Sequence, residues 1–173
     1  SQLLTLARAD RGKIKPNLEM LDISELLEIT ILEMQTSAGE KGISISTDIE
    51  EPHIKMLADE TMLMRIFVNL LQNAVIYGRE NGWIHVSLKE QNQEIQIVIQ
   101  DNGIGMEKDK LDKIWERFYQ VNPSREKKDS GSSGLGLSMV KWMVGIHNGS
   151  ISVDSQVNRG TIFTIKFPKK MDI

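Results

Sequence analysis

Cysteine is absent from this chain of 173 residues, which excludes both disulfide bonds and thiolate metal sites. Basic residues are not in excess: 21 Lys and Arg stand against 24 Asp and Glu, and the net charge of −3 gives no support to a nucleic-acid partner. No apolar run approaches the roughly 20 residues that cross a bilayer, and no signal-peptide pattern is present. The composition is globular, with 40% hydrophobic residues, and is sufficient for one domain with a single core.

Two periodicities of apolar residues divide the chain into helices and strands. Helical spacing predicts a helix that ends at Gly12, one that begins at 22–24 with Ser24 as its N-cap, and one through 59–77. Further helices are predicted at 111–118 and 135–147. Strands are predicted at 43–49, 53–57, 83–90, 94–101, 150–156 and 160–168. Because these elements mix without strict βαβ alternation, we predict an α+β fold, a two-layer sandwich with helices on one face of a mixed, mostly antiparallel sheet.

One predicted strand ends in an acid followed by two glycines, in the stretch DNGIGM at 101–106. Asp101 shares the parity of the isoleucines before it, so its carboxylate should point toward the packed face of the strand. A carboxylate at a core is costly unless a donor meets it, either from the protein or from a ligand. Gly103 and Gly105 leave the main chain open to a flat polar ligand such as a nucleobase. An ordinary strand-to-turn junction explains this stretch equally well on its own.

The predicted helix at 59–77 carries two asparagines beside its apolar stripe. Asn69 and Asn73 are four residues apart, so one lies above the other on the helix surface. Asparagine is a modest helix former, and a stacked pair at the border of a buried face needs a reason. Their carboxamide oxygens could hold Mg²⁺, which takes oxygen ligands and is shared between one or two protein groups and substrate phosphates. Alternatively, the pair only hydrogen-bonds neighbouring loops.

A third segment, GSSGLGLS at 131–138, runs straight into an apolar helix. Glycines just before a helix N-terminus expose main-chain N–H groups to an anion, and the helix dipole adds to the attraction. The segment is not a P-loop, because no Lys-Ser/Thr follows the glycines. It is not a dinucleotide fingerprint either, because a polar stretch that we expect to be mobile precedes it instead of a strand. A simple glycine linker is the alternative.

Together these segments offer a base-contacting acid, a magnesium-holding helix and a phosphate-binding helix start. In this combination the chain resembles the catalytic, ATP-binding domain of sensor histidine kinases, in the ATPase superfamily shared with DNA gyrase, the mismatch-repair ATPases and the heat-shock chaperone. The resemblance covers nearly all residues and implies the Bergerat-type ATP-binding fold. It is carried by NLLQNAVIYG as the N box, DNGIGM as the G1 box, WERFY as the F box, GSSGLGLS as the G2 box, and Gly160-Thr161 as the final motif.

The resemblance also implies a role for each matching residue. Asn73 should ligate Mg²⁺, with Asn69 assisting directly or through water, and these two are the residues implied to act in catalysis. Asp101 should accept a hydrogen bond from the adenine amino group of ATP, with Thr161 supporting that end of the pocket. The other positions implied to contact or enclose the nucleotide are Tyr77, Gly103, Gly105, Met106, Phe118, Arg125, Ser132, Ser133, Gly134, Leu135, Gly136 and Leu137.

The opening stretch LLTLARADRGK is similar to the end of the second dimerisation helix, a likeness that separates sensor kinases from their relatives. The resemblance thus implies the end of a dimerisation and phosphoacceptor helix at 1–12 and a catalytic ATP-binding domain at 13–173, with an ATP lid at about 106–133. The implied partners are the dimerisation and phosphoacceptor domain of the same kinase and a response regulator, in a homodimeric full-length protein. Because the chain opens with Ser1, we expect a piece of a longer protein. The resemblance implies that this piece is the cytoplasmic domain of a membrane-anchored bacterial sensor.

Two departures from the family pattern bear on phosphate binding. Ile76 stands where the N box usually carries a lysine, although Arg79 could supply the charge. Gln120 stands where an arginine often follows the phenylalanine-tyrosine pair. We therefore expect weaker phosphate affinity than is usual in the family.

Two other functions compete with that of a kinase. Hydrolytic ATPases of the same superfamily resemble one another in placing a glutamate base one helical turn before the magnesium asparagine, but here Asn69 occupies that position and cannot accept a proton at neutral pH. A degenerate module that regulates without catalysis is favoured only by Ile76. The three histidines, His53, His85 and His147, are expected to be structural, so the phosphoacceptor histidine should lie outside this chain.

Overall fold

The structure, a computed structural model, describes residues 15–116, 119 and 136–169. The strands in this part of the chain are β1 (Glu19–Asp22), β2 (Ser44–Ile49), β3 (Lys55–Ala58), β4 (Trp83–Gln91), β5 (Glu94–Asp101), β6 (Ser150–Gln156) and β7 (Gly160–Pro168). The helices are α2 (Ile23–Glu40), α3 (Glu60–Ile76) and α5 (Gly136–Ile146), with a short 3-10 helix, η1, at Lys108–Lys110. The predicted opening helix lies outside the described residues.

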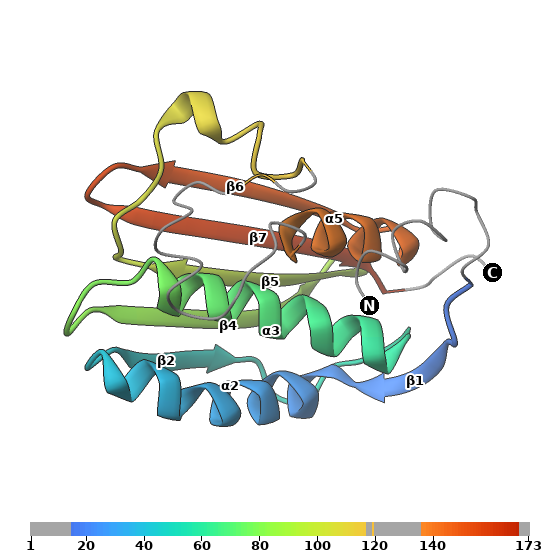
Figure 1. The fold of residues 1–173 in the computed structure, drawn as a ribbon. Helices are drawn as coiled ribbons and strands as arrows, with labels where there is room; N and C mark the ends of the chain where they lie inside the picture. The colour runs from blue at the N-terminus through green and yellow to red at the C-terminus, as the bar shows by residue number, and fades with distance from the viewer. Residues whose placement is uncertain (1–14, 117–118, 120–135, 170–173) are drawn as a thin grey trace.

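The larger sheet has the strand order β2-β4-β5-β7-β6, and β1 pairs with β3 in a separate two-stranded sheet. Within the larger sheet β2 and β4 run parallel, whereas the other neighbours are antiparallel. Helices α2, α3 and α5 lie side by side over one face of the sheet (Figure 1). Their buried side chains and those of the strands form one hydrophobic cluster. The predicted α+β two-layer sandwich is confirmed.

Strand β5 carries the candidate site at its C-terminal end. Its isoleucines Ile95, Ile97 and Ile99 are at most 1% exposed, and Asp101 is 6% exposed on the same face. The parity prediction is therefore confirmed. The hairpin from β4 into β5 turns through Asn92 and Gln93, both with positive φ, which is the conformation of a two-residue type I′ loop.

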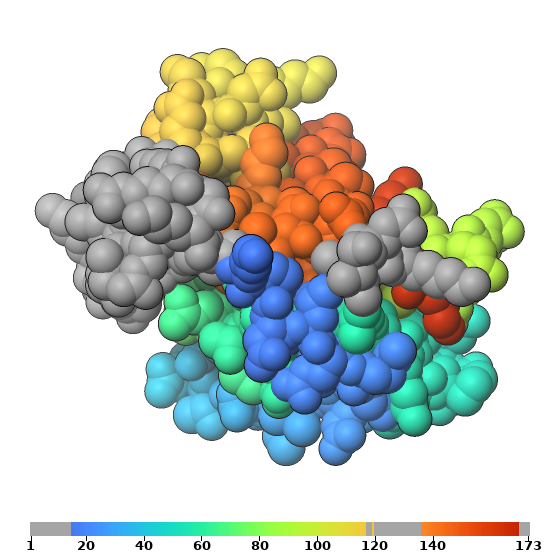
Figure 2. Space-filling view, turned by 90° about the vertical axis from the view of Figure 1, so that its right-hand side faces the viewer, coloured from blue at the N-terminus to red at the C-terminus, as the bar shows by residue number. Residues whose placement is uncertain are grey.

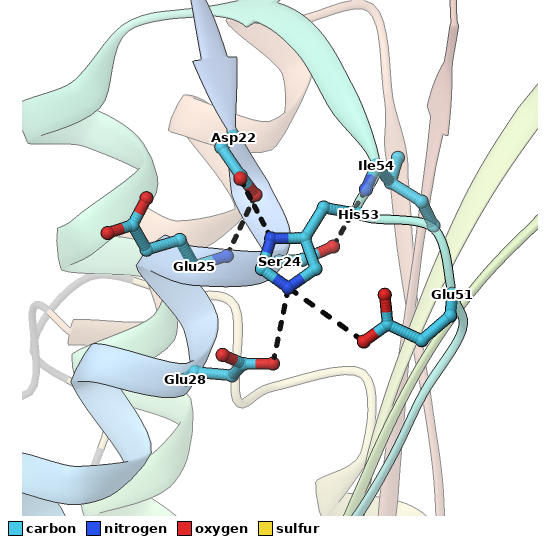
Figure 3. A network of polar contacts seen from close by, with 7 residues as sticks. All are labelled: Asp22, Ser24, Glu25, Glu28, Glu51, His53 and Ile54. Atoms are coloured by element: carbon cyan, nitrogen blue, oxygen red, sulfur yellow. Dashed lines mark hydrogen bonds and ion pairs between the residues drawn. The ribbon is translucent and has the colours of Figure 1, made fainter.

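The start of α2 corrects one prediction. Asp22, and not Ser24, is the N-cap: its Oδ1 accepts a hydrogen bond from the Glu25 N–H at 2.9 Å. The extended backbone of Asp22 at the end of β1 is the conformation that an N-cap requires. Ser24 is instead fully buried, and its hydroxyl accepts a hydrogen bond from the Ile54 N–H at 2.8 Å, which joins α2 to the segment before β3 (Figure 3).

His53 completes this capping network. Its Nδ1 lies 2.8 Å from Asp22 Oδ2, and its Nε2 faces Glu28 and Glu51, each at 3.9 Å (Figure 3). The hydrogen bond to Asp22 and the nearby carboxylates raise the pKa of His53 above its usual value, although partial desolvation acts against them. His53 thus supports the N-terminus of α2, as a structural histidine does.

The N-terminus of α3 is fixed by Asp59 and His147. The Asp59 carboxylate caps the helix by accepting from the Met62 N–H at 3.0 Å. The Asp59 N–H donates to Nε2 of His147 at 3.0 Å, so the ring proton must sit on Nδ1, which donates to the Met143 carbonyl at 2.8 Å. His147 is fully buried and joins the end of α5 to the start of α3.

The segment after β5 differs from the prediction of a helix at 111–118. Over its described residues it contains η1 followed by hydrogen-bonded turns at 111–115. Ile114, only 2% exposed, is the single fully buried side chain of this stretch, and Trp115 packs edge-on against Phe163 with ring centroids 6.1 Å apart. One buried residue anchors the segment, whereas a stable amphipathic helix needs a continuous apolar stripe.

Residues before β1 pass beside the starts of α3 and α5. Figure 2 shows this side of the molecule, with the N-terminal segment in blue below α5 in orange. A groove of about 320 Å³ lies here, between Lys15, Arg65 and Trp142 among others. Met139 and Met143 of α5 are each 1% exposed and belong to the hydrophobic core. None of the helices in the described residues is both long and apolar enough to span a membrane.

Candidate functional site

Residues of the asparagine helix, of the stretch after β5 and of the first turn of α5 meet at one cavity in the described part of the chain. Its walls come from the second half of α3, the end of β5 and the loop after it, the start of α5, and the start of β7. The lining residues are Asn73, Ala74, Tyr77, Asp101, Gly105, Met106, Ile114, Tyr119, Leu137, Thr161 and Phe163. The solvent-accessible space among these side chains is about 30 Å³, which is enough for ordered water.

Among the described residues that line this cavity, Asp101 is the charged one. Burial raises its pKa to about 6, against the opposing effect of main-chain hydrogen bonds from Gly103 and Thr161. The Gly103 N–H donates to Oδ1 at 2.8 Å. Within the described residues Asp101 has no ion pair, so its charge is stabilised by these N–H groups alone. A buried carboxylate with remaining lone pairs fits a ligand that brings hydrogen-bond donors.

Thr161 and Ser155 extend this polar group across the sheet. Asp101 on β5 is in register with Thr161 on β7, and Thr161 is in register with Ser155 on the edge strand β6. The Ser155 and Thr161 hydroxyl oxygens are 2.8 Å apart, and Ser155 Oγ also donates to the Gly160 carbonyl at 2.9 Å. All three side chains are buried. A row of hydroxyl and carboxyl groups thus runs from the cavity to the sheet edge.

The loop after β5 is held by main-chain hydrogen bonds on both sides. The Ile104 N–H donates to the Tyr77 carbonyl at 3.0 Å, and the Ile104 carbonyl accepts from the Asn158 N–H at 2.8 Å. A Cβ on Gly103 would collide with that Tyr77 carbonyl, and Gly105 has a φ of +70°. Both glycines are therefore required by the packing of the protein itself, in addition to any contact with a ligand.

Arg79 and Ile76 lie apart from the lining residues of this cavity. The Arg79 guanidinium donates to the Gly103 carbonyl at 3.4 Å and to Asn158 Oδ1 at 3.1 Å, so it fastens the loop after β5. Ile76 is buried and lines a separate pocket against α2. Lys41 caps the end of α3 there, with its Nζ 3.0 Å from the Val75 carbonyl. The structure gives no support to Arg79 as a phosphate contact.

The asparagine pair stands beside the start of α5. Asn69 and Asn73 are both half-buried on α3, and Asn73 lines the cavity. A Cβ on Gly136, the first residue of α5, would lie 3.7 Å from Asn69 Oδ1. The carboxamide oxygens and a helix N-terminus are therefore neighbours. The described residues contain no group of three or more His, Cys, Asp or Glu that could hold a metal ion.

Several predicted site residues cannot be placed. Gln120 and the whole of 131–135 lie outside the described residues, as do Phe118, Arg125, Ser132, Ser133, Gly134 and Leu135. Conversely, the sequence reading missed Ala74, Ile114, Tyr119, Phe163 and Ser155. Phe163 has the same strand parity as Thr161 and could have been found that way. Ser155 gave no signal, because the other residues of β6 are exposed or only half-buried.

The segment that forms the cavity matches a known protein family. The family described as histidine kinase-, DNA gyrase B-, and HSP90-like ATPase matches residues 58–171. The chain belongs to this family. The match spans all of the cavity walls, from α3 to β7.

Named relatives within the family are sensor kinases. The chain is 32% identical over 171 residues to the sensor-like histidine kinase SenX3 of Mycolicibacterium smegmatis, covering 99% of this chain and 44% of that protein. It is 35% identical over 167 residues to the heme sensor protein HssS of Staphylococcus saprophyticus, covering 96% and 35%. The crystal structure of full-length ShkA in complex with AMPPNP is 27% identical with a TM-score of 0.84, covering 99% of this chain and 35% of that one. The chain spans less than half the length of these curated relatives.

Proposed function

We propose that this chain is the ATP-binding catalytic domain of a two-component sensor histidine kinase. In this role it presents the γ-phosphate of Mg-ATP to a phosphoacceptor histidine outside the chain, for onward transfer to an aspartate of a response regulator. The observation that carries the proposal is the buried carboxylate of Asp101, which opens onto the same cavity as Asn73. The kinship with sensor kinases supports it.

Asp101 has the properties needed to recognise adenine. At pH 7 it is mostly ionised, and its lone pairs can accept from the exocyclic amino group of the base. Leu137, Ile114 and Met106 provide apolar surface for the ring faces. Thr161 adds a hydroxyl beside the carboxylate, and Tyr77 at the end of α3 lines the same cavity.

The phosphates and the metal ion would lie at the junction of α3 and α5. Asn73 and Asn69 would hold Mg²⁺ through their carboxamide oxygens, which are ligands of the kind this ion takes. When bound, the ion would neutralise charge on the phosphate oxygens. Gly136 and Leu137 open α5, so the N–H groups of this first turn would face the phosphates. The roles of Phe118, Arg125, Ser132, Ser133, Gly134 and Leu135 stay predictions.

Phosphoryl transfer asks the protein mainly to position reactants and neutralise charge. No described side chain that lines this cavity is a free base suited to activate water, because Asn73 is an amide and the Asp101 carboxylate is assigned here to the amino group of the base. This favours transfer to a separately supplied histidine over hydrolysis. The partners would then be a dimerisation and phosphoacceptor domain, to which residues 1–12 would belong, and a response regulator. We further propose a homodimeric, membrane-anchored parent with this domain in the cytoplasm.

The competing function is a nucleotide-binding module without kinase activity. Ile76 was the feature that favoured it. Because Ile76 packs against α2 and does not line the cavity of Asp101, its presence does not impair the described part of that cavity. The kinase is therefore the better supported of the two.

Calorimetric titration with ADP, with and without Mg²⁺, tests the proposal. The chain should bind ADP more tightly with Mg²⁺, Asp101→Asn should lose binding, and Asn73→Ala should lose most of the magnesium effect. Asp154→Asn, an exposed acid on β6, is the matched control and should bind normally. If the unaltered chain binds no adenine nucleotide, the proposal is wrong. In the full-length parent, Asn73→Ala should abolish labelling of the histidine by ATP.

A further inference from the structure

Ser155 occupies an unusual place for a serine on an edge strand. It is 4% exposed, whereas its neighbours on β6, Asp154 and Gln156, are exposed. In the register of the sheet it stands next to Thr161, which stands next to Asp101. Ser155 itself does not line the cavity, so it can affect a bound base only through Thr161 or through the loop after β5.

The hydrogen bonds of Ser155 fix where its proton must point. Three groups surround its Oγ: the Gly160 carbonyl at 2.9 Å, the Met106 N–H at 2.9 Å and Thr161 Oγ1 at 2.8 Å. A hydroxyl has one proton to donate and two lone pairs to accept with. The carbonyl can only accept and the N–H can only donate. All three contacts are satisfied together only when Ser155 donates to Gly160 and accepts from both Met106 and Thr161.

This assignment decides whether the Thr161 hydroxyl acts as a hydrogen-bond donor or acceptor toward the cavity. Its hydroxyl proton is committed to Ser155, so Oγ1 offers only lone pairs to the cavity. The neighbouring carboxylate of Asp101 also offers only lone pairs when it is ionised. The polar side chains at this edge of the cavity are then two acceptors side by side. A base with an amino group at this edge can donate to them, whereas an oxo group would place a third acceptor against two others, which is unfavourable in a buried site.

We propose that Ser155 is a positioning residue that, by holding the proton of Thr161, makes the cavity select a 6-aminopurine over a 6-oxopurine. This inference rests on the proposed nucleotide-binding function. It adds a residue outside the cavity that fixes whether the Thr161 hydroxyl donates or accepts toward the base. Without the Ser155 acceptor, the Thr161 hydroxyl is free to rotate and donate to an oxo group.

The probes are ADP and inosine diphosphate, which differ in the purine ring only in that the 6-amino group of adenine is replaced by a 6-oxo group with a proton on N1. Ser155→Ala should lower the ratio of ADP affinity to inosine diphosphate affinity by about three- to tenfold, the usual worth of one hydrogen bond. The change should arise mainly from tighter binding of inosine diphosphate. Ser155→Thr, which keeps the hydroxyl, should restore the ratio, and Ser152→Ala, exposed on the same strand, should leave it unaltered.

A second variant separates positioning from a purely structural effect. In Thr161→Val the hydroxyl is gone, so adding Ser155→Ala should change the affinity ratio no further. Thr161→Val by itself should weaken ADP while leaving inosine diphosphate unchanged or tighter, and this holds even if Ser155→Ala does not fold. An unchanged ratio in folded Ser155→Ala, or equal losses for both nucleotides in Thr161→Val, would overturn the inference while ADP binding still upheld the proposed function. Absence of ADP binding in the unaltered chain would overturn both.

Discussion

Replacing Asp101 with asparagine should abolish adenine-nucleotide binding and leave the fold as stable as before, or more stable. The two side chains have nearly the same shape. The difference is that an asparagine at this position would carry no charge into the buried site and would turn one acceptor into a donor. Binding is lost because the new amide N–H₂ faces the amino group of the base. Stability is not lost, because the ionised carboxylate is itself unfavourable in the folded state.

The size of the stability change follows from two opposing effects. The pKa of Asp101 is about 6, against an ordinary value of 3.8. Each pKa unit corresponds to about 1.36 kcal/mol, so keeping the carboxylate ionised in the fold costs about 3 kcal/mol at pH 7. The asparagine oxygen can accept from Gly103, but its amide group then meets the Thr161 N–H as a second donor, at a cost of about 1–3 kcal/mol. The net gain in unfolding free energy should lie between about 0 and 2 kcal/mol.

The pH dependence provides an internal check with a definite sign. Because the folded pKa of Asp101 lies above its unfolded value, the folded state binds more protons between about pH 4 and pH 6. The Asp101 contribution therefore lowers stability as pH rises through this window and stays constant above it. The asparagine of the variant does not titrate. The stability advantage of the variant should be largest at pH 7 and above, and it should shrink as pH falls toward 4.

Urea unfolding monitored by tryptophan fluorescence at pH 7, 6 and 5 measures this difference. Asp154→Asn is the control, since that exposed acid on β6 should show no such trend. The reasoning is refuted if Asp101→Asn lowers the unfolding free energy at pH 7 by more than about 1 kcal/mol. It is also refuted if the advantage grows as pH falls.

Three further changes should act on the scaffold of the site. His53→Gln should lower the melting temperature at pH 5.5 but not at pH 8, as thermal melts at both pH values would show. The pKa of His53 is raised in the folded state, so its charged interaction with Asp22 is present at low pH and is lost as the pH rises through that pKa. His147→Leu should lower the unfolding free energy by about 1–3 kcal/mol, measured in urea, because a buried main-chain N–H loses its acceptor. Gly105→Ala should weaken ADP binding and lower the melting temperature, since its φ of +70° and the adjacent Gln156 carbonyl leave no room for a Cβ; an unchanged melt would contradict this.

The elements that the sequence predicts well are those with an uninterrupted period. β5 shows this, because its alternating isoleucines are enough to predict that Asp101 lies on the buried face. The asparagine pair on α3 is equally predictable, since spacing of four on a strongly periodic helix fixes its face. The cap of α2 was misassigned because Asp22 and Ser24 are both good capping residues. The choice between them depends on a tertiary contact, the hydrogen bond from Ile54 to Ser24.

Contacts between distant segments explain the other misses. Ile114 lies in a charged stretch that was predicted as a short helix, and the pattern did not indicate that its side chain would line the cavity. Ser155 lies on a strand with no apolar period, and its burial follows from the register with Thr161. Arg79 seemed free to reach phosphate, but the β6–β7 turn brings Asn158 to it. These contacts join residues far apart in the sequence, so local sequence patterns do not predict them.

In this site the residue proposed to bind the base, Asp101, is distinct from the residues that hold it in place. Asp101 is unfavourable for stability, so other contacts must fix its position: the main-chain N–H groups of Gly103 and Thr161, and behind them Ser155 on the edge strand. Each of these partners is a short, rigid group on a strand or a tight loop, which leaves the carboxylate little freedom to turn away and find a more favourable environment. A base that donates to this carboxylate would stabilise its ionised form and lower its pKa. Nucleotide binding should therefore release protons near pH 6, and the affinity should fall as the pH is lowered below 6. Because asparagine does not titrate, Asp101→Asn should not show this dependence of binding on pH.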